Sequence, residues 1–110
     1  MQKRFRLTRN EDFKAVIVQK VSASNRSFVG YVGPNTCGHA RVGISIRAHY
    51  GHAVARNRAK RQVRAMSDQL VDFSKSLDFV FIIRDAFQTR TYAENNVELT
   101  YLYQKLLSKR

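Results

Sequence analysis

Five cations fall within nine residues in the middle of the chain, at Arg56, Arg58, Lys60, Arg61 and Arg64. Four of them are arginines, whose planar guanidinium groups bind phosphate oxygens in a bidentate way. If this stretch is helical, steps of 100° per residue place these cations and Asn57 on an arc of roughly 200°. We call these six residues the basic arc. Its chemistry suits the phosphates of a nucleic acid.

The sequence offers the basic arc no acidic partners. No Asp or Glu stands between Asp12 and Asp68, although ten Lys and Arg residues do. Basic helix faces are often only solvated, but like charges four residues apart destabilise a helix when no acid relieves them. Nucleic acid phosphates offset that cost and release counterions. We therefore expect the arc to bind a polyanion.

The composition fits a small folded domain with such a partner. The 110 residues are 44% hydrophobic, and 20 Lys and Arg against 8 Asp and Glu give a net charge of +12. This length predicts a single domain over residues 1–110, and the net charge predicts that it binds nucleic acid. We find no lipidation motif, signal peptide or long apolar run, so we expect a cytoplasmic protein that does not bind membranes. The lone Cys37 cannot form an internal disulfide, which agrees with a reducing compartment.

An apolar stripe opposite the basic arc predicts how the helix that carries the arc packs against the rest of the protein. Its members recur at three- and four-residue steps: Ala55, Ala59, Val63, Met66 and Leu70. This spacing predicts an amphipathic helix from Ala53 to Asp72 that docks on a sheet.

Two further helices are predicted from capping patterns. Thr8 and Glu11 have the spacing of a capping box, which predicts a first helix of about three turns that carries Phe13, Val16 and Ile17. Turn residues Ser22, Ser24 and Asn25 are expected to end it. Thr91 and Glu94 form a second capping box, before a final helix with apolar residues Leu99, Leu102, Tyr103 and Leu106.

Three segments are predicted to be strands. Ser27–Val32 is aromatic and β-branched, and Arg41–Ile46 alternates apolar and polar residues, so we expect these two to pair as a hairpin. Asp78–Ile83 is almost continuously apolar, which indicates a strand covered on both faces. The elements follow the order α-β-β(-β)-α-β-α. This order predicts an α+β fold, a single-domain layer sandwich.

The sequence resembles a known family in several segments. Arg56-Asn57-Arg58, followed by Lys60, Arg61 and Arg64, is similar to the signature helix of the bacterial ribonuclease P protein component. Arg41–Ser45 is similar to that family's preceding strand. Leu7–Phe13 and Asn25–Tyr31 are similar to its first helix and first strand.

The resemblance implies a protein subunit of the ribonuclease P ribonucleoprotein, an endoribonuclease that removes the 5′ leader of precursor tRNA to generate the mature 5′ end. Its partners are then the catalytic RNA subunit and precursor tRNA; we infer no obligate protein partner. The RNA subunit performs the hydrolysis with bound Mg²⁺, so no catalytic or metal-binding residue is expected in this chain, and the protein alone is expected to be inactive. A ribonuclease P protein-like fold also implies a left-handed β-α-β crossover.

The resemblance assigns two sets of binding residues. The RNA-binding positions are Arg56, Asn57, Arg58, Lys60, Arg61 and Arg64, and the positions of the 5′-leader cleft are Phe13, Ile17 and Tyr31. Spacing alone leaves Phe13 and Ile17 equally open to a role as core residues of an amphipathic helix. Ile17 stands where relatives commonly carry an aromatic residue, and the loop 48–52 lacks two cations that relatives usually have.

The residues support other functions less well. A metal-dependent nuclease would need more than Asp68 and Asp72, which are expected one turn apart on a helix. Sequence-specific DNA binding would need more short polar side chains than Asn57 and Gln62 beside the arginines. A zinc site has no standard spacing among Cys37, His39, His49 and His52. Another structured-RNA scaffold protein, such as a ribosomal protein, shares the electrostatics and remains the alternative.

Overall fold

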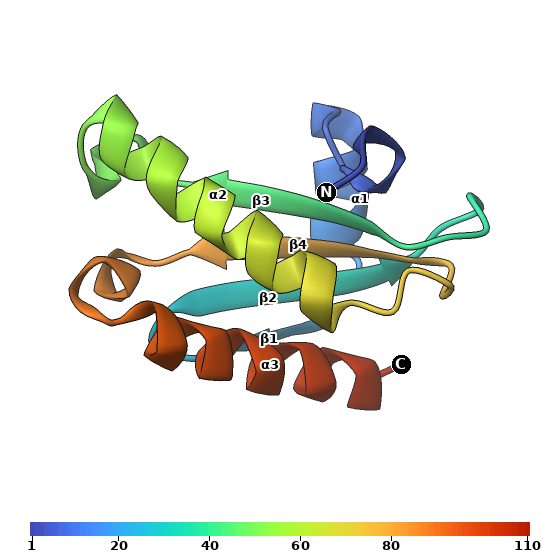
Figure 1. Ribbon diagram of the computed structural model, residues 1–110. Coiled ribbons are helices and arrows are strands. Elements are labelled where there is room, and N and C mark those ends of the chain that lie inside the picture. Colours follow the sequence, from blue (N-terminus) through green and yellow to red (C-terminus); the bar gives the residue numbers. More distant parts are fainter.

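The computed structural model describes residues 1–110 as three α-helices, four β-strands and three short 3₁₀ segments (Figure 1). The helices are α1 (Asn10–Val18), α2 (Ala53–Leu70) and α3 (Tyr92–Ser108). The strands are β1 (Ser22–Ser24), β2 (Phe28–Pro34), β3 (Arg41–Ile46) and β4 (Leu77–Ile83). The 3₁₀ segments are η1 (Lys3–Phe5), η2 (Ala48–Tyr50) and η3 (Asp85–Thr89). The predicted α+β order is confirmed, and β1 is the optional extra strand.

The four strands form one sheet in the order β1-β2-β4-β3. The predicted hairpin of β2 with β3 is wrong, because β4 lies between them, antiparallel to β2 and parallel to β3. The apolar run of β4 gives the physical reason. Phe79, Val80 and Phe81 are fully buried there, with a neighbouring strand on each side, whereas a β2–β3 hairpin would leave this run at an edge of the sheet.

The connection from β3 through α2 to β4 is a left-handed crossover. In Figure 1 both strands point to the left, β3 lies above β4, and α2 lies on the near side of the sheet. Nearly all crossovers between parallel strands have the opposite hand. The handedness that the family resemblance implies is therefore confirmed.

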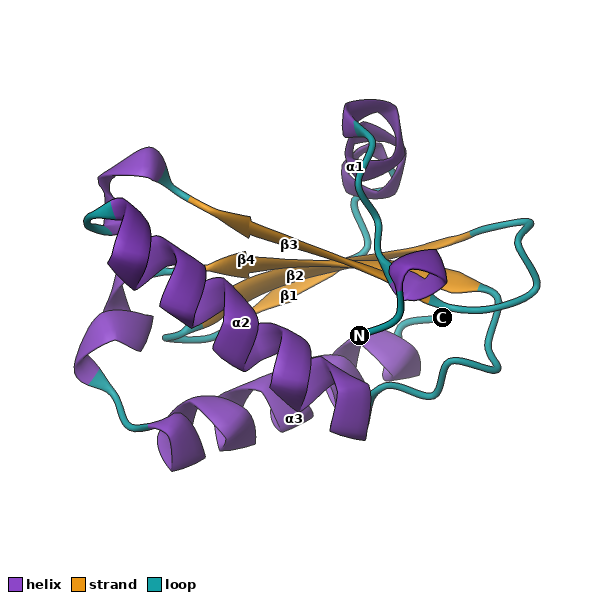
Figure 2. Ribbon diagram, turned by 45° about the horizontal axis from the view of Figure 1, so that its top comes forward, coloured by secondary structure: helices purple, strands orange, loops and turns teal.

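Helices cover the two faces of the sheet unequally (Figure 2). On the face that we call the closed face, α2 and α3 enclose a core cluster of 18 buried residues that includes Phe28, Phe79 and Phe81. On the opposite face, the open face, α1 is the only helix. Its Val16 packs with Leu7 and Val80 in a cluster of three buried residues. The open face is thus only partly covered by the protein's own chain.

Two details at the first helix differ from prediction. The N-cap of α1 is Arg9, without a side-chain cap, so the capping box at Thr8 is wrong. A backbone hydrogen bond of 2.9 Å from Leu7 N to Val42 O keeps the preceding chain beside β3. Ser22–Ser24 forms the edge strand β1 instead of a turn, because the chain already turns at Lys20, where φ is +60°. Asn25 keeps its predicted turn role, since its Oδ1 accepts hydrogen bonds from Ser27 N and Phe28 N.

The other helices follow their predictions closely. The capping box of α3 is confirmed: Thr91 Oγ1 accepts from Glu94 N at 3.1 Å, and Glu94 Oε1 accepts from Thr91 N at 2.9 Å. All four apolar residues predicted on this helix are buried. The second helix ends at Leu70, two residues before the predicted end. No helix of the chain is both long enough and apolar enough to cross a bilayer.

Candidate nucleic-acid interface

The two sides of α2 differ as predicted. Ala59, Val63 and Met66 are buried in the core of the closed face. Asn57, Arg58 and Arg61 are exposed, whereas Arg56, Lys60 and Arg64 are half-buried. All five cations of the basic arc lack an ion pair, because the salt bridges of the protein involve other residues: the N-terminal amine, Arg41, Arg47 and Arg90. The arc therefore presents uncompensated positive charge.

Arg56 differs from the other members of the arc because it also supports the loop before α2. Its Nη1 donates hydrogen bonds to Ala48 O, at 3.1 Å, and to Gly51 O, at 2.5 Å. These bonds fix η2 against the first turn of α2. Arg56 thus has a structural task within the protein, beside any task toward RNA.

The arc faces two separate hollows, one on each flank of α2. Arg58 lines a cavity toward η3 and the start of α3. Lys60 and Arg64 line a smaller hollow of about 280 Å³ together with Arg6 of the N-terminal segment. Burial, and then the charge of Arg6, lower the pKa of Arg64 from its usual value. Three cations around one hollow form a site suited to a phosphate group.

Arg6 is a candidate residue that the sequence analysis missed. Its position follows from the pairing of the N-terminal segment with β3, where Arg6 bridges to Val42. The sequence shows cations at Lys3, Arg4 and Arg6, but no local pattern says which of them approaches α2.

The predicted leader residues lie on the open face. Phe13 and Tyr31 pack, partly buried, against the same small cluster beneath α1. The Phe13 ring lies directly over β3 at Gly43, where an added Cβ would come within 2.6 Å of Phe13 Cζ. Ile17, one turn further along α1, is 37% exposed. The structure thus brings Phe13 and Tyr31 together and leaves Ile17 at the rim.

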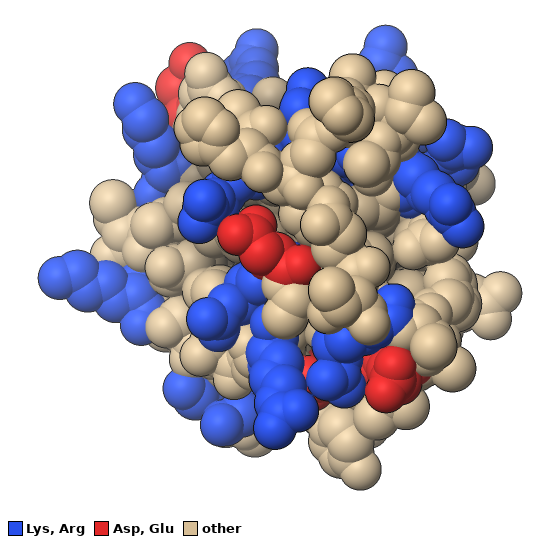
Figure 3. All heavy atoms as spheres, turned by 90° about the vertical axis from the view of Figure 1, so that its left-hand side faces the viewer, with Lys and Arg blue, Asp and Glu red and all other residues tan.

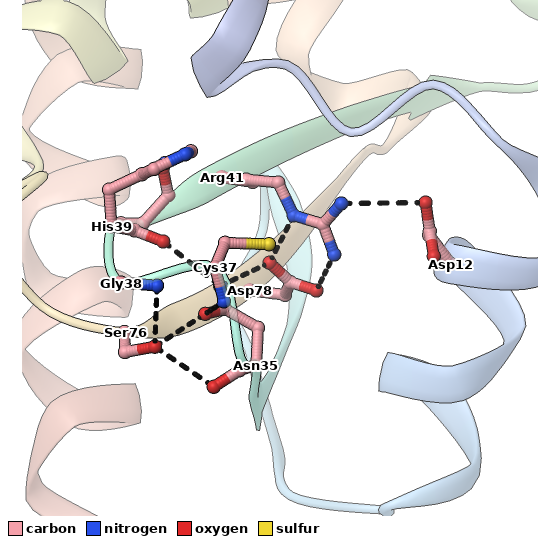
Figure 4. Close-up of polar contacts among 9 residues, drawn as sticks. Asp12, Asn35, Cys37, Gly38, His39, Arg41, Ser76 and Asp78 are labelled. Atoms are coloured by element: carbon pink, nitrogen blue, oxygen red, sulfur yellow. Dashed lines mark hydrogen bonds and ion pairs between the residues drawn. The ribbon is translucent and has the colours of Figure 1, made fainter.

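A network of polar contacts ties α1 to this face (Figure 4). Arg41 Nη2 lies 2.7 Å from Asp78 Oδ2 of β4, and Arg41 Nη1 lies 3.5 Å from Asp12 Oδ2 of α1. Asn35 Nδ2 also donates to Asp78 Oδ1, at 2.7 Å. The hydrogen bond to Asp78 is the main cause that raises the pKa of Arg41. The Arg41–Asp12 contact therefore adds to the packing of Phe13 on β3 that holds α1 over the open face.

The acids considered for a nuclease are engaged elsewhere. Asp72 lies beyond the end of α2 and accepts hydrogen bonds from Ser74, so the predicted pair one turn apart on a helix does not form. Asp68 lies 2.8 Å from the N-terminal amine. Hydrogen bonds from Ser74 lower the pKa of Asp72.

The four residues weighed as zinc ligands lie at opposite ends of β3. Cys37 and His39 precede the strand, and His49 and His52 follow it. No group of three or more His, Cys, Asp or Glu side chains comes together anywhere in the protein.

Comparisons with known proteins agree on one family. The sequence profile of the family described as Ribonuclease P matches residues 1–107. The ribonuclease P protein component of Streptococcus pneumoniae strain Hungary19A-6 is 39% identical over 110 residues, 99% of this chain and 88% of that protein. A mutant Staphylococcus aureus RNase P protein with defective mRNA degradation activity superimposes with a TM-score of 0.82 at 30% identity, over 93% of this chain and 87% of that one. The Thermotoga maritima RNase P protein in complex with 1-(4-fluorophenyl)-2-thiourea superimposes with a TM-score of 0.77 at 26% identity, over 87% of this chain and 94% of that one.

Proposed function

The chain belongs to the ribonuclease P protein family, and from that premise we propose that it is the protein subunit that binds the catalytic RNA and the 5′ leader of precursor tRNA in the cytoplasm. The observation that carries the proposal is the basic arc of α2, whose five cations have no acidic partner. A folded RNA supplies the phosphates that relieve this repulsion. The ribonucleoprotein then removes the leader by phosphodiester hydrolysis.

The hydrolysis itself is assigned to the RNA subunit. Asp68, Asp72 and Asp78 are held by an amine, by Ser74 and by Arg41, respectively, and do not converge on one point. We assign the Mg²⁺ ions that the hydrolysis needs mainly to the RNA, whose phosphate oxygens are suitable ligands for this ion. The protein contributes affinity and orientation.

The open face is assigned to the leader. An unpaired strand needs aromatic surfaces for its bases and cations along its backbone. Phe13 and Tyr31 supply the aromatic surfaces. Beyond them, Arg26, Arg47 and Arg84 line a hollow next to Ile82 of β4 together with one acid, Asp85, so cations continue along the sheet. Binding of the leader there favours precursor over mature tRNA.

Reconstitution tests the proposal. Precursor tRNA is incubated with a bacterial catalytic RNA at low Mg²⁺ concentration, with and without the chain. We expect cleavage at the mature 5′ end to require the chain under these conditions, and the chain alone to be inert. Cleavage by the purified chain without RNA would contradict the proposal.

The salt dependence of RNA binding tests the role of the arc. If about five phosphates are engaged, the slope of log K against log salt concentration is near −4, and the loss of one arginine reduces it by about 1. Arg58→Ala and Arg64→Ala are the suitable variants, because these side chains make no hydrogen bond or ion pair within the protein. Arg56→Ala would also release the loop before α2.

A further inference from the structure

A further hollow lies away from the open face, at the end of the molecule where α2 and α3 begin. It is a cavity of about 600 Å³ between the first turns of α2, η3 and the first residue of α3. Figure 3 views the molecule from this end, and Lys and Arg side chains predominate over Asp and Glu around its surface. The leader residues Phe13 and Tyr31 do not line the cavity. Neither the proposed leader site nor the hollow at Arg6 accounts for it.

Six of the twelve residues that line the cavity are apolar or aromatic. Tyr50 and Phe87 are buried at its base, and Val54 and Tyr92 stand at its rim, 78% and 47% exposed. Apolar side chains that are exposed together around a hollow are typical of a binding groove. Tyr92 offers a ring face that no other ring of the protein covers. A flat, apolar ligand would fit these walls.

The polar half of the lining includes two guanidinium groups, beside His52, Gln62, Gln88 and Thr91. Arg58 reaches the cavity from the basic arc, and Arg90 reaches it from the loop before α3. The Nε of Arg90 is buried and has no hydrogen-bond acceptor in the protein. Its Nη2 lies 3.8 Å from Glu98 Oε1, too far for a hydrogen bond but near enough to hold the group in place. The Nε itself is out of reach of a ligand, but the Arg90 side chain as a whole is 23% exposed, so its guanidinium can still donate to a ligand acceptor.

We infer that this cavity binds one unpaired nucleotide of the RNA that α2 contacts, with the base stacked on Tyr92 and the phosphate on Arg58. The inference deepens the proposed function and depends on it. A nucleotide combines the three features that the cavity needs: a flat base, hydrogen-bond acceptors on the base edge for Arg90, and a negative charge. Continuity with the basic arc through Arg58 favours RNA over a protein partner.

A fluorescence experiment tests the stacking. The chain has no tryptophan, so Tyr92→Trp introduces a single reporter at the rim of the cavity. Tyr101→Trp is the matched control, because Tyr101 lies on the same helix, 65% exposed, and does not line the cavity. On addition of a bacterial ribonuclease P catalytic RNA, we expect strong quenching and protection from acrylamide at position 92 and little change at position 101. Equal quenching at both positions, or none at position 92 while the RNA is bound, would overturn the inference.

Affinity measurements provide the second test. Arg90→Met should weaken binding of the catalytic RNA about ten-fold, because it removes a charged donor from the nucleotide. Lys105→Met removes the same charge from an exposed site on α3 and should change the affinity less than about two-fold. Equal losses in the two variants would mean that only net charge matters. If the unmodified chain does not bind the RNA at all, the proposed function fails; if it binds and Arg90→Met is silent, only the cavity assignment fails.

Discussion

The closed and open faces of the sheet differ in how completely helices cover them. On the closed face, Phe28, Phe79 and Phe81 are fully buried beneath α2 and α3. On the open face, Phe13 and Tyr31 remain partly exposed, because α1 alone lies there. Aromatic side chains left half covered in a protein of net charge +12 are suited to stack on unpaired bases. The difference indicates that one face supplies stability and the other supplies binding.

The largest expected effect comes from a charge on the closed face. Val63 is fully buried, and Val63→Asp places a carboxylate in the core without a partner. We expect a loss of more than about 4 kcal/mol in the free energy of unfolding. Circular dichroism should show no cooperative thermal transition. Ala65→Asp, on the exposed side of the same helix, should melt almost normally. A normal transition for Val63→Asp would contradict the orientation of α2.

Two glycines on opposite faces allow a more discriminating comparison. At Gly43 an added Cβ lies 2.6 Å from Phe13 Cζ, and at Gly30 it lies 2.8 Å from Leu102 Cδ2. Both alanine variants should lose about 1–3 kcal/mol of stability through overpacking, as urea denaturation measures it. Only Gly43→Ala should also weaken the binding of precursor tRNA relative to mature tRNA, because it displaces Phe13. Equal binding losses in both variants would contradict the assignment of stability to the closed face and of RNA binding to the open face.

Local patterns predicted most of the elements but not their pairing. The apolar stripe of α2 and the Thr91–Glu94 capping box are local, so the sequence predicted the two longer helices to within two residues. The place of β4 between β2 and β3 depends on which strand covers its apolar run, a contact between residues distant in the chain. That choice has no local signal, and a hairpin was the wrong prediction.

The contrast between local patterns and long-range contacts also applies to the candidate sites. The basic arc is a single helical segment, so its residues could be predicted from spacing. Arg6 and Arg90 reach the two flanks of α2 only through long-range packing of the N-terminal segment and of η3. The grouping of Phe13 with Tyr31 came from the family resemblance, since spacing alone also allowed a core role for Phe13. The assignment of these residues to RNA binding stays a prediction.

Two tyrosines sharpen the comparison further. Tyr31→Ala on the open face should weaken the affinity for precursor tRNA about ten-fold and leave the affinity for mature tRNA unchanged, because the loss of one stacking ring costs about 1–3 kcal/mol. Tyr103, on the closed side, is 5% exposed, and its hydroxyl accepts a 2.9 Å hydrogen bond from Asp72 N. Tyr103→Phe should cost about 1 kcal/mol of stability and change neither affinity. Equilibrium binding and denaturation of both variants give the two readouts.

The smallest expected effect concerns the ion pair that anchors α1. Asp12→Asn removes a contact of 3.5 Å between side chains that are 21% and 30% exposed, while Arg41 keeps Asp78 at 2.7 Å. Such a partly exposed pair contributes less than about 1 kcal/mol, so the affinity for precursor tRNA should fall only about two-fold. The difference should shrink in high salt, which screens the pair. A loss as large as that of Gly43→Ala would mean that charge, and not the packing of Phe13 on β3, holds α1 over the open face.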